Sequence, residues 1–196
     1  MKSRELALIA ILLAIGTVIY AFTPNLGVMT PDTVSTFAVL AILLVRPKLS
    51  AGLGIGIVAG LIGMFFSKSP IAWFNVVVHA AGALNATFWT SKLPEMKLGP
   101  VYLKSLLITL AYKLVGGELF ITAMLAFGII PFKIYITVAW SNVLISLAIG
   151  IVIVLILYPP AKALYERQTS AVARWNARAK QPWARASARN SHATDS

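Results

Sequence analysis

The feature that most constrains this chain is a series of long apolar runs that hold few charges. Hydrophobic residues make up 59% of its 196 residues, which is above the share found in soluble domains. A helix needs about 20 apolar residues to cross the hydrocarbon core of a bilayer, and about 17 are a practical minimum. The sequence therefore predicts an all-α integral membrane protein with six transmembrane helices. The predicted spans lie near residues 5–22, 31–45, 50–67, 71–90, 101–127 and 133–158.

Basic residues gather in every second loop. They precede the first predicted span, follow the second, separate the fourth from the fifth and follow the sixth, whereas the remaining loops hold only Lys68 and Lys133. Lys and Arg are enriched in the cytoplasmic loops of membrane proteins. The pattern predicts cytoplasmic N- and C-termini, in agreement with an even number of spans. Because the net charge of +11 follows the loops in this way, we expect a lipid bilayer as a partner and no nucleic acid.

The composition changes after the last apolar run, which divides the chain into two regions. Residues 1–160 form the predicted membrane domain, and residues 161–196 form a basic cytoplasmic tail. In the tail, apolar residues such as Leu164 and Trp175 fall on one side of a helix and arginines on another, which predicts an amphipathic helix on the inner membrane surface. The Ala-, Ser- and Arg-rich end after Pro182 is typical of a disordered segment.

The second predicted span is shorter than the others. A helix from Pro31 to Val45 rises only about 22 Å, whereas the hydrocarbon core is about 30 Å thick. Thr30 is the predicted N-cap, with Pro31 in the first turn and Asp32 near the positive end of the helix dipole. We therefore expect the preceding loop, residues 23–32, to dip into the outer leaflet, where protein must bury it.

The third predicted span carries glycines at every fourth position. Gly52, Gly56 and Gly60 share one face of a helix, and small residues on such a face let another helix approach closely. The run lacks the GxGxxG spacing and a preceding strand. It therefore predicts close helix packing and not a nucleotide-binding loop.

Polar and aromatic side chains interrupt the predicted spans at one common depth. The fourth span runs inward, so that Asn75 and His79, four residues apart on one face, lie in its outer half. The directions of the other spans bring further groups to the same level. Together they form our candidate substrate-binding residues: Asp32, Trp73, Asn75, His79, Lys113, Glu118, Trp140 and Asn142. A cluster drawn from separate helices indicates a ligand pocket that opens to the outside.

Each of these residues also has a purely structural interpretation. Asn75 or Asn142 can bond a neighbouring helix, and His79 can bond a main-chain carbonyl. Asp32 can serve the helix dipole alone, and tryptophans near the interface can belong to an aromatic belt. The collective pattern, more than any single residue, favours the pocket.

Lys113 is the most demanding of the candidates. A lysine near the bilayer centre costs about 2.5–3.5 kcal/mol on insertion scales, so it needs a partner. Glu118 is the only carboxylate in the interior of a predicted span, but residues five apart on a helix are rotated by about 140°. Either Gly116 and Gly117 distort the helix, or each charge has another partner. A bound zwitterion would serve both, with its carboxylate on Lys113 and its ammonium on an acid.

The sequence argues against several functions. It has no cysteine and only two histidines, His79 and His192, so that we expect no metal centre and no cofactor. It lacks the GxxxxGK[ST] loop of P-loop ATPases and a duplicated half with paired broken helices. Its candidates for an acid–base pair or a nucleophile are too few and too poorly spaced for an enzyme. We therefore expect a small binding subunit, not an enzyme, that depends on other proteins for energy.

The N-terminal run KSRELALIAILLAIGTVI resembles the first helix of the substrate-binding (S) components of energy-coupling factor (ECF) transporters. In that family a small-residue face on this helix docks onto the transmembrane scaffold subunit; Ala10 and Ala14 match that face and Ala7 extends it. The run GVMTPDTVSTFAVLAILL is similar to the tryptophan-transporter subgroup, TrpP, and the run LYPPAKAL fits the same family. The resemblance covers residues 2–165.

The resemblance implies import of a scarce small nutrient across a prokaryotic cell membrane. An S component binds the nutrient from outside and topples in the membrane when the scaffold subunit and two ATPase subunits turn over. Likeness to the subgroup implies tryptophan, for which Phe22, Trp73 and Trp140 would supply aromatic walls. The alternatives are another vitamin-specific S component, a membrane enzyme that acts on a lipid-like substrate, and a structural subunit whose polar groups serve assembly.

Overall fold

The computed structural model describes residues 1–24, 31–67, 69–99 and 101–191. The chain divides into two units, Met1–Tyr158 and Pro159–Ser196. This division lies within two residues of the predicted boundary between the membrane domain and the tail.

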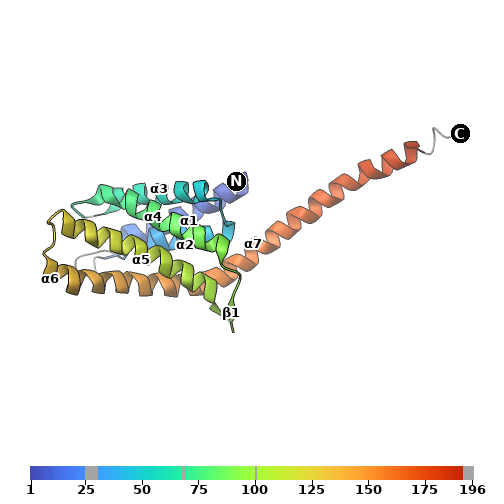
Figure 1. Cartoon of the computed structure of the whole chain (residues 1–196). Helices are drawn as coiled ribbons and strands as arrows, with labels where there is room; N and C mark the ends of the chain where they lie inside the picture. The colour runs from blue at the N-terminus through green and yellow to red at the C-terminus, as the bar shows by residue number, and fades with distance from the viewer. Residues whose placement is uncertain (25–30, 68, 100, 192–196) are drawn as a thin grey trace. The chain divides into compact units, whose positions relative to one another are not determined.

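Helices dominate both units (Figure 1). The elements are α1 (Ser3–Phe22), α2 (Thr33–Val45), α3 (Leu49–Phe66), η1 (Ala72–Phe74), α4 (Asn75–Lys92), β1 (Lys97–Leu98), β2 (Val101–Tyr102), α5 (Leu103–Ala126), α6 (Phe132–Ile134), η2 (Tyr135–Ala139) and α7 (Trp140–Ser191). Element η1 is a 3-10 turn, and η2 is a π-helical turn that leads directly into α7. Each apolar run that predicted a span is helical over most of its length.

Within the described part of the chain, four helical segments are long and apolar enough to cross a membrane. They are α1, α3, α5 and the segment Phe132–Val172. Helix α2 is apolar but has only 13 residues, and α4 has 18 residues but is less apolar because it carries Asn75, His79 and Asn85. Large apolar side chains on α1 and α3, such as Val18 and Phe65, are exposed in the isolated chain. The chain is thus a mainly helical, membrane-associated protein, whereas six spans and cytoplasmic termini stay predictions.

Helix α2 lies in the centre of the first unit. All twelve of its residues from Thr33 to Leu44 are buried, because α1, α3, α4 and α5 pack around it. Thr30, the N-cap expected from the sequence, lies outside the described residues together with most of the loop before it. The helix begins later than predicted, and Asp32 itself is the N-cap: its side chain accepts a hydrogen bond from the Ser35 N–H.

The glycine face of α3 packs closely against another helix, as predicted, and the structure identifies that helix as α4. A Cβ atom built on Gly56 would lie 2.6 Å from the His79 main-chain oxygen, and one on Gly60 would lie 2.5 Å from the Val76 Cα atom. Real Cβ atoms do not approach other atoms so closely, and glycine alone permits this spacing. Gly54, which is on another face, has nothing within 4 Å of such an atom.

A small β-hairpin between α4 and α5 departs from the predicted all-α fold. Lys97 pairs with Tyr102 and Leu98 with Val101 in antiparallel register. Gly99 has a φ of +60° in this hairpin, a conformation that glycine adopts without strain. Each strand has only two residues, too few for the alternating apolar pattern by which a strand is recognised in a sequence. The N-terminus and this hairpin lie at one end of the first unit, and α6 lies at the other (Figure 1).

The second unit is one helical segment. The sequence predicted disorder after Pro182, but α7 continues to Ser191. Alanine and arginine, which are frequent in this stretch, have among the highest helix propensities, and this local preference favours the helix. Leu164, Val172 and Trp175 are exposed along the segment, and their contact with a membrane surface stays a prediction.

Candidate functional site

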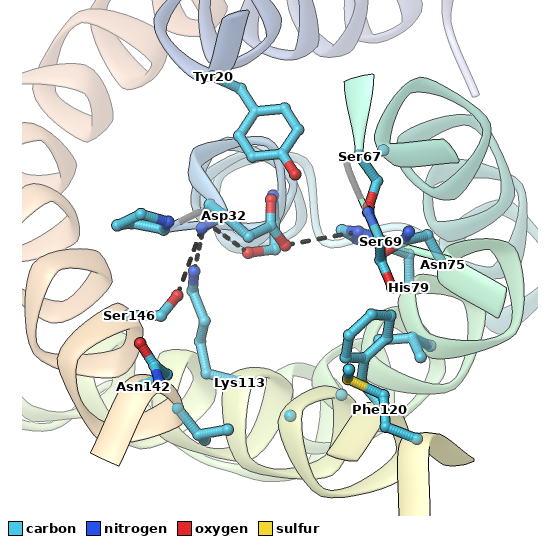
Figure 2. A pocket seen from close by; sticks show the side chains of 18 of the residues that line it. Tyr20, Asp32, Ser67, Ser69, Asn75, His79, Lys113, Phe120, Asn142 and Ser146 are labelled. Carbon is cyan, nitrogen blue, oxygen red and sulfur yellow. Dashed lines mark hydrogen bonds and ion pairs between the residues drawn. The ribbon is translucent and has the colours of Figure 1, made fainter. Parts of the chain in front are cut away.

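A cavity of about 370 Å³ lies in the first unit, at the end where α1 finishes and α2 begins. It is enclosed by the end of α1, the start of α2, the end of α3, the start of α4, the middle of α5 and the start of α7. Five of the eight candidate residues line it: Asp32, Asn75, His79, Lys113 and Asn142. Tyr20, Phe120 and several serines also line the cavity (Figure 2). Tyr112 is a further lining residue. The loop charges predict that this end faces the exterior.

The Asp32 carboxylate projects from the start of α2 towards the middle of the cavity (Figure 2). Its Oδ1 atom accepts a hydrogen bond of 3.0 Å from the Ser35 N–H, which is the capping bond of α2. Its Oδ2 atom lies 3.4 Å from His79 Nε2. The Asp32 side chain is 32% exposed, whereas that of His79 is 3% exposed. Asp32 therefore presents an accessible charge at the centre of the site.

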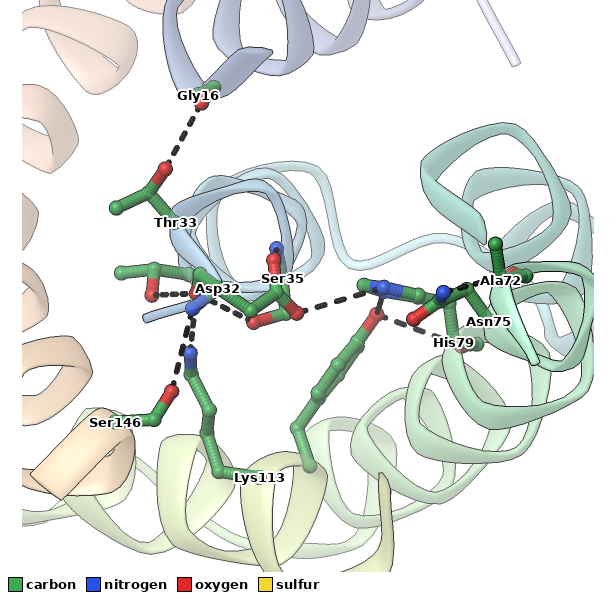
Figure 3. A network of polar contacts seen from close by, with 11 residues as sticks. Gly16, Asp32, Thr33, Ser35, Ala72, Asn75, His79, Lys113 and Ser146 are labelled. Atoms are coloured by element: carbon green, nitrogen blue, oxygen red, sulfur yellow. Dashed lines mark hydrogen bonds and ion pairs between the residues drawn. The ribbon is translucent and has the colours of Figure 1, made fainter. Parts of the chain in front are cut away.

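The main chain of Asp32 is held as firmly as its side chain. Its N–H donates to Ser146 Oγ of α7 at 3.4 Å, and its carbonyl oxygen accepts from Lys113 Nζ of α5 at 2.5 Å. The same oxygen accepts from the hydroxyls of Ser35 and Thr36 at 3.0 and 3.2 Å. Figure 3 shows how these contacts converge on one residue from three helices.

Lys113 and Glu118 do not pair with each other. Helix α5 runs unbroken through Gly116 and Gly117, so the second of the two sequence alternatives holds and each charge has its own partner. Glu118 Oε1 accepts hydrogen bonds from the hydroxyls of Thr122 and Tyr135, both at 3.0 Å. Its Oε2 atom is buried and has no partner among the described residues. Glu118 does not line the cavity.

His79 makes side-chain contacts on both ring nitrogens. Nδ1 lies 3.1 Å from the hydroxyl of Tyr112, and Nε2 faces Asp32. The Tyr112 hydroxyl also donates to the His79 main-chain oxygen at 3.4 Å. The sequence suggested a main-chain carbonyl as the alternative partner of this imidazole. The structure instead gives it a carboxylate and a phenol, so that His79 joins α4 to α2 and α5.

The two cavity asparagines use their amide nitrogens locally. Asn75 Nδ2 donates to the Ala72 main-chain oxygen and Asn142 Nδ2 to that of Val138, both at 2.8 Å. Figure 3 shows the Asn75 nitrogen turned towards Ala72 and its oxygen turned away from it. Each asparagine thus places one of its two amide N–H donors on a nearby main-chain oxygen and not on another helix.

The tryptophans expected as aromatic walls are not at the cavity. Trp73 is 52% exposed and meets Phe74 and Phe127 edge to face, with ring centroids 5.5 and 6.0 Å apart. Trp140 packs against an apolar cluster around Phe120, and Phe22 is 84% exposed. The rotation of each helix about its axis sets where these aromatic side chains point, and the sequence does not specify that rotation.

Tyr20 and Tyr112 are cavity residues that the sequence analysis missed. A tyrosine in the middle of an apolar run needs a partner for its hydroxyl, and this signal identifies Tyr112 in retrospect. Tyr20, close to the end of a predicted span, is not distinguishable in the sequence from a belt residue.

A smaller pocket of about 190 Å³ is lined by residues at the end of α2, at and after the end of α4, and at the start of α5. Arg46 pairs there with Glu95, and Lys104 Nζ donates to the Leu93 main-chain oxygen at 2.8 Å. The hydroxyls of Thr87 and Thr90, which line this pocket, are buried and have no hydrogen-bond partner among the described residues.

The proposed docking residues lie on one exposed side of the first helix. Ala7, Ala10 and Ala14 are exposed on α1, whereas Ile9 and Leu13 face the interior. Across residues 1–24, 31–67, 69–99 and 101–191, no three His, Asp or Glu side chains are grouped as a metal site would require. Comparison with known proteins finds no family model, no curated protein and no solved structure that matches this chain.

Proposed function

We propose that this chain is the membrane-embedded substrate-binding subunit of an ECF-type importer. It captures a small nutrient, with tryptophan as the first candidate, from outside a prokaryotic cell. It then delivers the nutrient by toppling on a scaffold subunit driven by two partner ATPases. The observation that carries the proposal is a cavity, among apolar helices, that holds the accessible Asp32 carboxylate. Ionisable groups within a membrane bundle are rare and mark substrate pathways.

The size and lining of the cavity support a small ligand with an apolar part. Its volume of about 370 Å³ falls within the range of roughly 300–1,000 Å³ found for ligand pockets. Phe120 and Met124 supply apolar surface, and Tyr20 and Tyr112 supply aromatic rings with polar ends. A few fixed polar groups in an otherwise apolar wall are what orients a ligand such as an amino acid.

The exposed small-residue side of α1 supports the proposed scaffold contact. Small side chains let two membrane helices approach closely, and Ala7, Ala10 and Ala14 leave such a surface open on this unit. The resemblance of the same run to the first helix of S components supports the same assignment.

Ligand-induced thermal stabilisation tests the proposal. The full chain, purified in detergent, is heated with each member of a panel of amino acids and vitamins, and tryptophan is expected to raise the melting temperature. Ser146→Trp, which fills the cavity, should abolish the shift. Ser141→Trp, at an exposed position of the same helix, should retain it. If no member of the panel stabilises the protein, the proposal is wrong.

A membrane enzyme is the second candidate, because Asp32 lies beside the His79 imidazole and such a pair is a possible general base. The enzyme interpretation requires that the protein convert a lipid-like substrate into a different product. Mass spectrometry of membrane lipids incubated with the protein tests it: a new product would favour the enzyme, and unchanged lipids together with nutrient binding favour the importer.

A further inference from the structure

We infer that the cavity recognises its ligand through a protonated amine, which the Asp32 carboxylate contacts directly, while Lys113 is a positioning residue that acts through Asp32. The inference rests on the proposed function and specifies the chemical group of the nutrient that the protein recognises. It also reverses one expectation from the sequence, in which Lys113 held the carboxylate of a zwitterion.

Accessibility separates the two charges. The Asp32 side chain is 32% exposed, whereas Lys113 as a whole residue is 7% exposed. A ligand that enters the cavity therefore meets the carboxylate first. Direct hydrogen bonds to an ionised group are about twice as strong as those between neutral groups. Of Asp32 and Lys113, which both line the cavity, Asp32 presents the more accessible charge.

The end of the Lys113 side chain is already engaged by the protein. Its ammonium donates to the Asp32 main-chain oxygen at 2.5 Å. A Cβ atom on Gly150 would lie 2.8 Å from Lys113 Cε and 3.1 Å from Thr36 Oγ1, so the end of the side chain is enclosed between α7 and α2. The main-chain oxygen takes one of the three ammonium donors, and the enclosure of the side-chain end restricts the approach of a ligand carboxylate to the other two. Lys113 instead places a positive charge behind Asp32, which offsets the cost of a carboxylate among apolar helices.

The other fixed groups at the cavity also favour a hydrogen-bond donor. The amide nitrogens of Asn75 and Asn142 donate to the main-chain oxygens of Ala72 and Val138. Their amide oxygens are left to act as acceptors at the cavity that the Asp32 carboxylate also lines. An ammonium group has three donors and no acceptor, so it complements this set of oxygens better than a carboxylate does.

The experiment compares ligands that differ only in their charged groups. Tryptophan is tested with tryptamine, which lacks the carboxylate, and with 3-indolepropionate, which lacks the amine. Leucine, isoamylamine and 4-methylpentanoate form a second set, in case the apolar part is not an indole. Affinity is measured on the full chain by calorimetry and thermal shift. The amine should bind within about tenfold of the amino acid, and the acid at least about a hundredfold more weakly.

Two variants locate the recognition on Asp32. Asn caps a helix as well as Asp does, so Asp32→Asn keeps the start of α2 while it removes the charge. This variant should lose amine binding by about a hundredfold and lose the preference for amine over acid. Lys113→Met should weaken both ligand types and leave their ratio unchanged. Glu118→Gln, which removes a carboxylate that does not line the cavity, should change neither affinity nor preference.

The outcomes separate this inference from the proposed function. Acids that bind as tightly as amines, or an Asp32→Asn variant that keeps the amine preference, would overturn the inference while the importer proposal stands. If no member of either set binds, the inference falls, and the wider panel of amino acids and vitamins decides the importer proposal. A changed ratio in Lys113→Met would identify Lys113 as a direct ligand contact and also overturn the inference. The ligand comparison on the unaltered chain decides the question even if a variant does not fold.

Discussion

Lys113 of α5 donates a 2.5 Å hydrogen bond to the main-chain oxygen of Asp32, 81 positions earlier in the chain. The bond ties the middle of one helix to the start of another and fixes the residue that carries the accessible carboxylate. Hydrogen bonds to charged groups stabilise proteins by about 1.5–3 kcal/mol. The contact therefore contributes both to the stability of the fold and to the geometry of the site.

We first predict that Lys113→Met lowers the melting temperature of the detergent-purified protein. The substitution keeps most of the side-chain volume but removes the donor to Asp32, so a loss of about 1.5–3 kcal/mol is expected. Lys133→Met removes a lysine at an exposed position and serves as the matched control. Equal melting temperatures for the two variants would mean that the Lys113 contact does not stabilise the fold.

The packing of α3 on α4 gives a second prediction. Gly56→Ala should destabilise the protein by about 1–3 kcal/mol, because the new methyl group meets main-chain atoms of His79 and Ala80 at 2.6 and 2.8 Å. Main chain cannot move aside as a flexible side chain can. Gly54→Ala has free space and should be neutral or stabilising, by up to about 1 kcal/mol, because alanine favours helix. Thermal melting of the pair checks the contrast, and a loss of stability in Gly54→Ala would contradict it.

Two buried threonines should respond in opposite directions to the same substitution. Thr90→Val removes a buried hydroxyl that has no partner among the described residues, so the variant should melt at the same or a higher temperature. Thr109→Val removes a hydroxyl that donates to the Ser105 main-chain oxygen at 2.7 Å and should cost about 0.5–1.5 kcal/mol. Equal destabilisation of both would indicate that Thr90 has a partner, such as a bound water.

The proposed scaffold contact predicts a separation of transport from binding. Ala10→Trp and Ala14→Trp should abolish nutrient uptake by cells while the purified variants still bind the ligand, because a bulky side chain prevents close helix approach. Ile19→Trp lies about 140° around the helix from Ala14 on another exposed part of α1 and should preserve uptake. Loss of binding in both alanine variants would contradict a docking role.

The sequence was a good guide to the helices, because each apolar run long enough to span a bilayer folds as a helix. Their boundaries were less predictable. Helix α4 begins at Asn75, several residues late, because a 3-10 turn occupies Ala72–Phe74. The start of α2 moved to Thr33 because Asp32 caps the helix with its own side chain. Side-chain capping decides where a helix begins, and several consecutive residues in the sequence can act as the cap.

The candidate site was predictable in part. Asn75 and His79 lie at the same cavity because residues four apart share a helix face, which a sequence shows directly. The partner of Lys113 was not predictable, because it is a main-chain oxygen and every residue carries one. Trp73 and Trp140 point elsewhere, and Tyr20 and Tyr112 point inward, because the rotation of each helix depends on tertiary packing.

The complete enclosure of α2 has a consequence for its behaviour in bilayers of different thickness. Hydrophobic mismatch acts on helices that touch lipid, which respond by tilting. Helix α2 is buried from Thr33 to Leu44. Lipid therefore does not contact it, and acyl-chain length does not act directly on its tilt. The depth of Asp32 is set by Lys113, His79 and Ser146 and not by the surrounding lipid. Thickening or thinning the membrane should therefore re-orient the outer helices while ligand affinity stays constant.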